Sequence, residues 1–136
     1  MIVRQVMSPE VRAIKRENSV RLAMRLLVLD DIRHLPVVED ERLVGIVSER
    51  DLRPLLVGVL EKGENPDEVE RRLSQPISNV MTTEVFAVHP ETKLVDAVET
   101  MVTNRVGALP VVEVDTDKLV GILSYVDVLK LVQNLL

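Results

Sequence analysis

The sequence contains no cysteine and no tryptophan, and Phe86 and Tyr125 are its only phenylalanine and tyrosine. Without cysteine, the chain can form no disulfide, no thiol nucleophile and no thiolate metal site. With so few aromatic side chains, it lacks the platforms on which single-stranded nucleic-acid binders stack bases. The formal net charge of -5 also disfavours a partner with a phosphate backbone. Nucleic acid is therefore not an expected ligand.

Long apolar runs are also missing. No stretch approaches the roughly 18 consecutive apolar residues that suggest a membrane-spanning helix. The first residues, MIVRQ, lack the apolar core of a signal peptide. Hydrophobic residues make up 46% and charged residues 29% of the 136 positions, which is typical of folded globular proteins. We expect a cytoplasmic protein with no membrane partner.

One phrase occurs twice in the chain. Residues 35–51 read LPVVEDERLVGIVSERD, and residues 109–127 read LPVVEVDTDKLVGILSYVD, with a two-residue insertion. The similarity extends backward at a constant offset of 74, so that Val6-Met7 matches Val80-Met81. This pattern indicates an internal duplication with a unit of about sixty residues. Because a unit that small buries only about 60% of its unfolded surface alone, we expect the two copies to pack on each other.

Each copy predicts the order strand, helix, strand, strand, helix, and therefore a layered α/β fold. A short strand around Val11 and Ile14 is expected first, with Asn18 or Ser19 as the N-cap of the helix that follows. The division is repeat 1 over residues 1–60, a linker with a short helix over 61–75, and repeat 2 over 76–136. The predicted strands are 35–39, 43–48, 109–114 and 119–124, and the predicted helices are 20–29, 49–60, 66–73, 93–102 and 125–135.

Both copies of the phrase end on Gly, two apolar residues, Ser, two variable residues and Asp, where a strand gives way to a helix. The Ser-Asp pairs are Ser48 with Asp51 and Ser124 with Asp127. One interpretation is a capping box, in which the pair satisfies backbone N–H groups at the helix start. The other is a ligand site, because a helix N-terminus favours phosphate and an Asp can accept ribose hydroxyls. The residues alone leave both interpretations open.

The ordered set of Val-Met-Ser/Thr, a helix, Leu-Pro-Val-Val and Gly-x-x-Ser-x-x-Asp closely resembles the CBS domain. Two copies in tandem resemble a CBS pair, or Bateman module, and the resemblance covers essentially the whole chain. It implies repeats packed with pseudo-twofold symmetry that bind adenosine nucleotides or related adenosyl ligands in clefts between them. The implied ligand is AMP, ADP, ATP or an S-adenosylmethionine-like compound, and no catalytic cofactor is expected.

The resemblance also assigns roles to particular residues. Asp51 and Asp127 would hold the ribose hydroxyls, and Ser48 and Ser124 would contact phosphate. The apolar residues expected to sandwich the base are Val11, Val37, Val85 and Val111.

Arg33-His34 precede the first Leu-Pro phrase, where some nucleotide-sensing relatives carry a basic pair that faces the phosphates. The second copy has Gly107-Ala108 at these positions, so only one half supplies the charge. The alternative for this pair is solvated charge in a loop between a helix and a strand.

The function expected from this resemblance is a non-catalytic regulatory sensor that signals to an effector protein in trans. We also expect a homodimer, because the helix over 20–29 and the C-terminal run expose more apolar surface than one sheet can cover. The alternative is a structural dimerisation adaptor that binds no nucleotide. An enzyme is not expected because no catalytic constellation is visible. A metal site is not expected either, since His89 has no second ligand at metal spacing.

Overall fold

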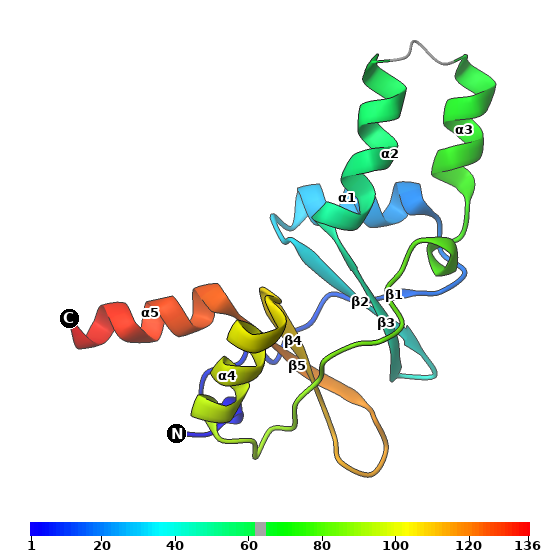
Figure 1. The fold of residues 1–136 in the computed structure, drawn as a ribbon. Coiled ribbons are helices and arrows are strands. Elements are labelled where there is room, and N and C mark those ends of the chain that lie inside the picture. Colours follow the sequence, from blue (N-terminus) through cyan, green and yellow to red (C-terminus); the bar gives the residue numbers. More distant parts are fainter. Residues whose placement is uncertain (62–64) are drawn as a thin grey trace. The chain divides into compact units, whose positions relative to one another are not determined.

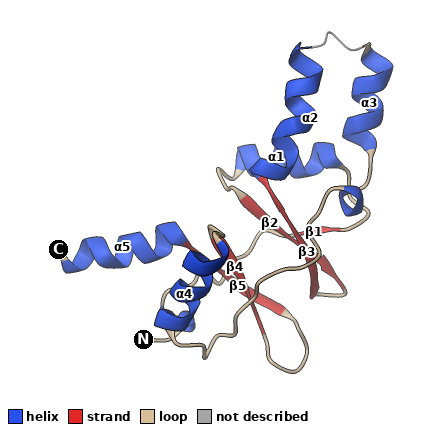
Figure 2. Ribbon diagram, viewed as in Figure 1, coloured by secondary structure: helices blue, strands red, loops and turns tan. Residues whose placement is uncertain are grey.

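The computed structural model describes residues 1–61 and 65–136 (Figure 1). Residues 62–64, within the predicted linker, lie outside the described residues. The α/β class is confirmed, with helices packed on two small sheets (Figure 2). The elements in chain order are η1 (Val3–Gln5), β1 (Ile14–Lys15), α1 (Val20–Leu29), β2 (His34–Glu39), β3 (Arg42–Ser48), α2 (Glu49–Glu61), α3 (Pro66–Ser74), η2 (Ile77–Asn79), α4 (Leu94–Asn104), β4 (Ala108–Val112), β5 (Leu119–Ser124) and α5 (Tyr125–Leu135).

Helix α1 begins where the sequence predicted, because Ser19 caps it. The Ser19 Oγ accepts a hydrogen bond of 3.1 Å from the Leu22 N–H, which satisfies a donor that the helix itself cannot. The linker helix α3 has Asn65 as its cap and Pro66 in its first turn, as the predicted start at Pro66 requires. Within residues 1–61 and 65–136, no helix is long and apolar enough to cross a membrane.

The first strand of each repeat is shorter than the sequence suggested. In the first repeat it covers only Ile14–Lys15, which pairs in parallel with Val37 and Val38 of β2, and Val11 lies outside it. In the second repeat it is reduced to a single parallel bridge between Val88 and Val111. Strand β4 also ends two residues early, at Val112, because the register of its antiparallel pairing with β5 shifts there.

The chain forms two compact units that do not follow the order of the sequence. The first-repeat unit contains residues 12–39 and 44–84, and the second-repeat unit contains residues 1–11, 40–43 and 85–136. Each unit therefore combines the strands and helices of one repeat with the opening segment of the other. Two units built by exchange of segments were not foreseen from the sequence.

Backbone hydrogen bonds hold each exchanged segment in place. In the first-repeat unit, Thr82 and Ile46 exchange two N–H···O bonds of 2.9 and 3.0 Å. In the second-repeat unit, Ser8 and Ile122 do the same at 2.9 and 3.0 Å. Each opening segment thus lies antiparallel against the strand that leads to the Ser-x-x-Asp helix start.

The glycine of each phrase makes room for the methionine of the exchanged segment. A Cβ placed on Gly45 would lie 2.8 Å from the Met81 Sδ and 3.1 Å from the Thr82 carbonyl oxygen. A Cβ on Gly121 would lie 2.6 Å from the Met7 Sδ and 3.0 Å from the carbonyl oxygen of Ser8. A real Cβ essentially never lies within 3.0 Å of another atom, so a side chain on either glycine would displace the methionine and press on the backbone beside it. The opening Val-Met and the later glycine therefore recur together because they touch.

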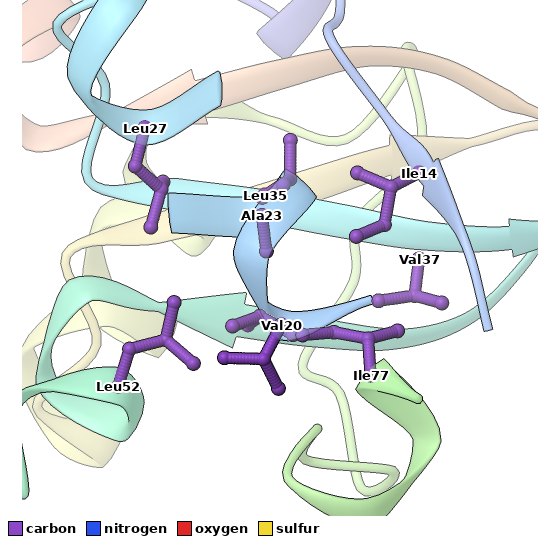
Figure 3. Packing of buried hydrophobic residues seen from close by; sticks show 9 residues of the cluster. Ile14, Val20, Ala23, Leu27, Leu35, Val37, Leu52 and Ile77 are labelled. Atoms are coloured by element: carbon purple, nitrogen blue, oxygen red, sulfur yellow. The ribbon is translucent and has the colours of Figure 1, made fainter. Parts of the chain in front are cut away.

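Each unit has its own hydrophobic core. In the first-repeat unit, α1 contributes Val20, Ala23 and Leu27, which lie on one face of the helix at spacings of three and four (Figure 3). The exchanged segment contributes Ile77, which has no exposed surface. Its counterpart in the second-repeat unit is Val3, which is also fully buried. Burying such a side chain stabilises a fold by roughly 1.5–3 kcal/mol, so each unit depends on the other repeat's opening residues.

Candidate functional site

The start of α2 is a capping box built by Ser48 and Asp51. The Ser48 N–H donates to the Asp51 Oδ2 at 2.8 Å, and the Asp51 N–H donates to the Ser48 Oγ at 3.2 Å. Two backbone donors that the helix cannot satisfy internally are thereby paired. The carboxylate also lies in the first turn, where the helix dipole favours negative charge. The capping interpretation of this pair is therefore correct for the ligand-free chain.

The start of α5 repeats this arrangement with one more bond. The Ser124 N–H donates to the Asp127 Oδ2 at 2.9 Å, and the Asp127 N–H donates to the Ser124 Oγ at 3.2 Å. The Ser124 hydroxyl in turn donates to the same Oδ2 at 3.1 Å. The second helix start is therefore held by three hydrogen bonds between the same two residues.

Capping occupies only one oxygen of each carboxylate. Every hydrogen bond that the described residues make to the side chains of Asp51 and Asp127 ends on Oδ2. The Oδ1 of each residue keeps both lone pairs, and both side chains remain partly exposed. The two interpretations of the phrase are consequently compatible. A single Asp can cap its helix and still accept a hydroxyl from a ligand.

A loop is fixed beside each helix start by the same backbone bond. The Glu49 N–H donates to the Arg33 carbonyl at 2.9 Å, and the Tyr125 N–H donates to the Gly107 carbonyl at 3.0 Å. In the first-repeat unit this bond places the basic pair of the sequence analysis next to the capping box. In the second-repeat unit the same bond places a residue without a side chain there.

His34 is electrostatically coupled to this helix start. Burial is the main cause that lowers the pKa of His34 below its usual value, because a buried imidazole avoids charge. The carboxylate of Asp51 opposes that shift, and the guanidinium groups of Arg50 and Arg33 add to it. The side chain thus lies within the field of the Asp51 carboxylate and of two cations. Burial therefore favours the neutral imidazole in the ligand-free chain.

Arg33 is exposed at the same loop. No ion pair joins it to a carboxylate within the part of the chain that the structure describes. The first-repeat unit therefore brings Arg33, His34, Ser48 and Asp51 together at one end of its sheet, with a guanidinium available to an anion. Whether these residues bind a ligand stays a prediction.

The four valines expected beside the base fall into two groups. Val37 and Val111 have no exposed surface and belong to the two cores, which favours a structural role for them. Val11 and Val85 are partly buried and lie outside the helices and strands. Both belong to the second-repeat unit, with Ser124 and Asp127. Base contact by any of the four valines remains a prediction.

His89 has a structural environment. Its Nδ1 lies 2.9 Å from the Val112 carbonyl oxygen, and its N–H donates to the Thr92 Oγ1 at 3.0 Å. Among the described residues, no group of three or more His, Asp or Glu side chains could hold a metal ion.

Comparison with known families agrees with the repeated geometry. The model of the CBS domain matches the chain twice, over residues 3–58 and 77–134. The uncharacterized protein MJ1232 of Methanocaldococcus jannaschii is 31% identical over 92% of this chain, which spans only 37% of that protein. The CBS domain-containing protein DDB_G0289609 of Dictyostelium discoideum is 28% identical over the whole chain and 94% of its own length.

Solved structures show the same fold. The structure of CBSX2 in complex with AMP superposes with a TM-score of 0.81 at 31% identity, over 98% of this chain and 97% of the other. The CBS domain pair of MJ0100, in complex with 5′-methylthioadenosine and S-adenosyl-L-methionine, has a TM-score of 0.82. It covers 100% of this chain and 98% of the other, and at 22% identity it shows the fold alone. With two family matches that together cover most of its length, the chain belongs to the CBS domain family and is a tandem CBS pair.

Proposed function

We propose that the chain is a non-catalytic sensor that binds AMP, ADP, ATP or a related adenosyl ligand at its two Ser-x-x-Asp helix starts. The proposal includes an effector protein that receives the signal in trans. The observation that supports it is that capping leaves the Oδ1 of Asp51 and of Asp127 free to accept a hydroxyl at the same place in both units.

The relatives support an adenosyl ligand. CBSX2, with 31% identity over nearly the whole chain, was solved with AMP. The pair of MJ0100, which has the same fold, was solved with two adenosyl compounds that carry no phosphate. Both kinds of ligand share the adenosine ribose, which is the part that Asp51 and Asp127 would hold.

The charges favour different ligands at the two helix starts. Near Asp51 the chain supplies Arg33, His34 and Arg50, and a guanidinium can bind a phosphate through two hydrogen bonds. The equivalent positions near Asp127 are Gly107, Ala108 and Val126. We therefore assign phosphorylated ligands to the first-repeat site and expect less dependence on phosphate at the second.

A thermal-shift screen of AMP, ADP, ATP, S-adenosylmethionine and 5′-methylthioadenosine tests the proposal, with GMP and GTP as base controls. A ligand at one hundred times its Kd adds about 2.7 kcal/mol to the free energy of unfolding, which raises the Tm of a chain this size by several degrees. Adenosyl compounds should shift the Tm more than guanosine nucleotides. If no adenosyl compound shifts it at millimolar concentration, the structural adaptor is the better description.

Self-association belongs to both candidate functions. Helix α5 buries none of its residues and exposes Leu129 at 58%, Leu135 at 79% and Val126 at 42%. At the end of α1, Val28 is 78% and Leu29 is 72% exposed. Apolar surface of this extent is typical of an interface between subunits. Light scattering should give about twice the 15.3 kDa of one chain at micromolar concentration, and a monomer mass would contradict the dimer.

A further inference from the structure

In the first-repeat unit, helix α3 covers one face of α1. The side chains of Met24 on α1 and Leu73 on α3 both pack against the core of that unit. The Arg21 guanidinium on α1 forms an ion pair of 2.5 Å with Glu70 on α3. The carbonyl that follows α3, at Gln75, accepts a 3.0 Å hydrogen bond from the Val20 N–H. A nine-residue amphipathic helix is therefore seated against α1 by apolar contact and by opposite charge.

The second-repeat unit contains the same attachment point at the same offset of 74. The Met1 carbonyl accepts a 2.9 Å bond from the Leu94 N–H, as the Gln75 carbonyl accepts one from Val20. Met1 thus takes the place of Gln75, and α4 takes the place of α1. Among the described residues of the second-repeat unit, no helix lies against α4 as α3 lies against α1 in the first-repeat unit.

The face of α4 that corresponds to the α3 contact is apolar and exposed. Val95, at the position of Arg21, is 68% exposed, and Val98, at the position of Met24, is half-buried. Val102 continues this stripe one turn further at 73% exposure. Its counterpart Val28 is 78% exposed even with α3 present, so a helix as short as α3 covers only the first two turns.

The charge of this face is opposite to that of α1. Helix α1 carries Arg21 and Arg25 and receives the acidic side chain of Glu70. Helix α4 carries Asp96 and Glu99 and has no Lys or Arg between Leu94 and Asn104. A helix that complements α4 must therefore offer an apolar side chain where α3 has Glu70, flanked by basic residues.

We propose that the exposed face of α4, formed by Val95, Val98 and Val102 with Asp96 and Glu99 at its edges, docks a basic amphipathic helix of a partner protein. The partner helix lies as α3 lies on α1 and places apolar residues one turn apart against the valines. This surface would deliver the sensor's output. It contains none of the residues of the helix starts at Ser48 and Ser124, so it can be tested without any nucleotide.

A grafted helix tests whether the face accepts this chemistry. A copy of residues 65–74 is added directly before Met1, with its Glu68 changed to Lys and its Glu70 to Leu, so that the copy becomes basic and more apolar. The matched control is the same copy with its Val69 and Leu73 both changed to Gln. We expect the basic graft to raise the Tm by several degrees and to slow amide exchange in α4, while the control does neither. Equal Tm values for the two grafts would overturn the proposal.

A positive charge introduced on α4 gives a second, independent measurement. Val95→Arg recreates the residue that α1 uses, so it should favour a copy of α3 with its natural Glu70 and weaken the effect of the basic graft. If Val95→Arg does not change which of the two grafts raises the Tm more, the added helix binds elsewhere.

Binding in trans is measured with a fluorescent peptide of the basic graft sequence. The anisotropy of the peptide should rise when the unmodified chain is added. The affinity measured in this way should fall at least tenfold with Val95→Lys. It should stay unchanged with Val114→Lys, because Val114 is a 66% exposed valine outside α4. Equal binding to Val95→Lys would contradict the docking site. A change from dimer to monomer mass in Val95→Lys would show that a second copy covers this face, and would also overturn the proposal.

Discussion

The two units have the same backbone arrangement at the candidate sites and differ in the side chains placed on it. In both, an exchanged segment bridges a strand, a glycine accommodates a methionine, and an Asp caps the next helix through Oδ2. The first-repeat unit adds cations beside its helix start and a helix over α1. Among its described residues, the second-repeat unit has neither at the equivalent positions. The shared features hold the fold, and the differences are where ligand and partner preference can reside.

The largest loss of stability is expected from substitutions that disturb the backbone arrangement shared by the two units. Ala at Gly121 brings a Cβ within 2.6 Å of the Met7 Sδ and 3.0 Å of the Ser8 carbonyl oxygen, so the exchanged segment must move. Overpacking of this kind costs roughly 1–3 kcal/mol. Gly45→Ala meets slightly longer contacts and should cost less than Gly121→Ala. Urea unfolding of both variants checks the order, and equal stability to the unmodified chain would contradict the role given to the glycines.

The next effect concerns ligand binding by the two carboxylates. Asp51→Asn keeps an oxygen that can accept the Ser48 N–H, so ligand-free stability should change by less than about 1 kcal/mol. Loss of the charged acceptor should lower nucleotide affinity at that site roughly tenfold or more. Asp127→Asn should do the same at the other site.

Calorimetry on each single variant and on the double variant separates the two sites. Full nucleotide affinity in the double variant, together with a clear loss of ligand-free stability, would show that both residues serve only the helix ends.

A smaller effect should appear in only one of the two units. Arg33→Ala removes a guanidinium beside the first-repeat helix start and should reduce the preference for ATP over AMP there by several-fold. Gly107→Arg should increase that preference at the second-repeat site. Titrations in the Asp127→Asn and Asp51→Asn backgrounds assign each change to its site. If the ratio of ATP affinity to AMP affinity is the same with and without the Arg33 side chain, the basic pair does not contribute to phosphate binding.

The smallest expected effect is the pH dependence caused by His34. Because burial lowers its pKa in the folded chain, the unfolded chain binds a proton more readily. Its contribution to stability is therefore complete above the unfolded pKa of about 6.5 and decreases as the pH falls below it. A bound phosphate would favour the charged imidazole, so nucleotide binding should tighten over the same interval.

His34→Ala should flatten both pH dependences, as measured by Tm and by calorimetry between pH 5 and 8. The second-repeat unit has Ala108 at this position and provides an internal comparison. Tighter nucleotide binding at higher pH would contradict the role assigned to His34.

The sequence predicted the elements well where local signals are strong. Ser19 before an apolar run, Pro66 after Asn65 and the Ser-x-x-Asp spacing each specify a helix start without help from the rest of the fold. The exchange of opening segments could not be predicted in this way, because it depends on contacts far apart in the chain. Met7 and Gly121 recur with Met81 and Gly45, but nothing in one sequence says which methionine meets which glycine.

The candidate site was predicted with the same limits. The capping box was identified from spacing and the basic pair from the resemblance to the CBS domain. The complete burial of Val37 and Val111 was not predicted, because a strand residue can face either the core or a ligand. Capping uses one oxygen of each carboxylate and leaves the chemically equivalent oxygen as an acceptor. Whether a ligand reaches that acceptor depends on the surrounding fold, which no short sequence pattern encodes.

The segment exchange also sets an order for folding during synthesis. The first-repeat unit needs residues only up to Glu84, so it can close while the rest of the chain is still being made. Residues 1–11 belong to the other unit and must wait for residues 85–136 to emerge, which takes on the order of 3–10 s at about 5–20 residues per second. During that interval Val3, which ends fully buried, has no core to enter. A newly made chain is therefore most vulnerable to proteases and to misassembly in residues 1–11, after half of these 136 residues have already folded.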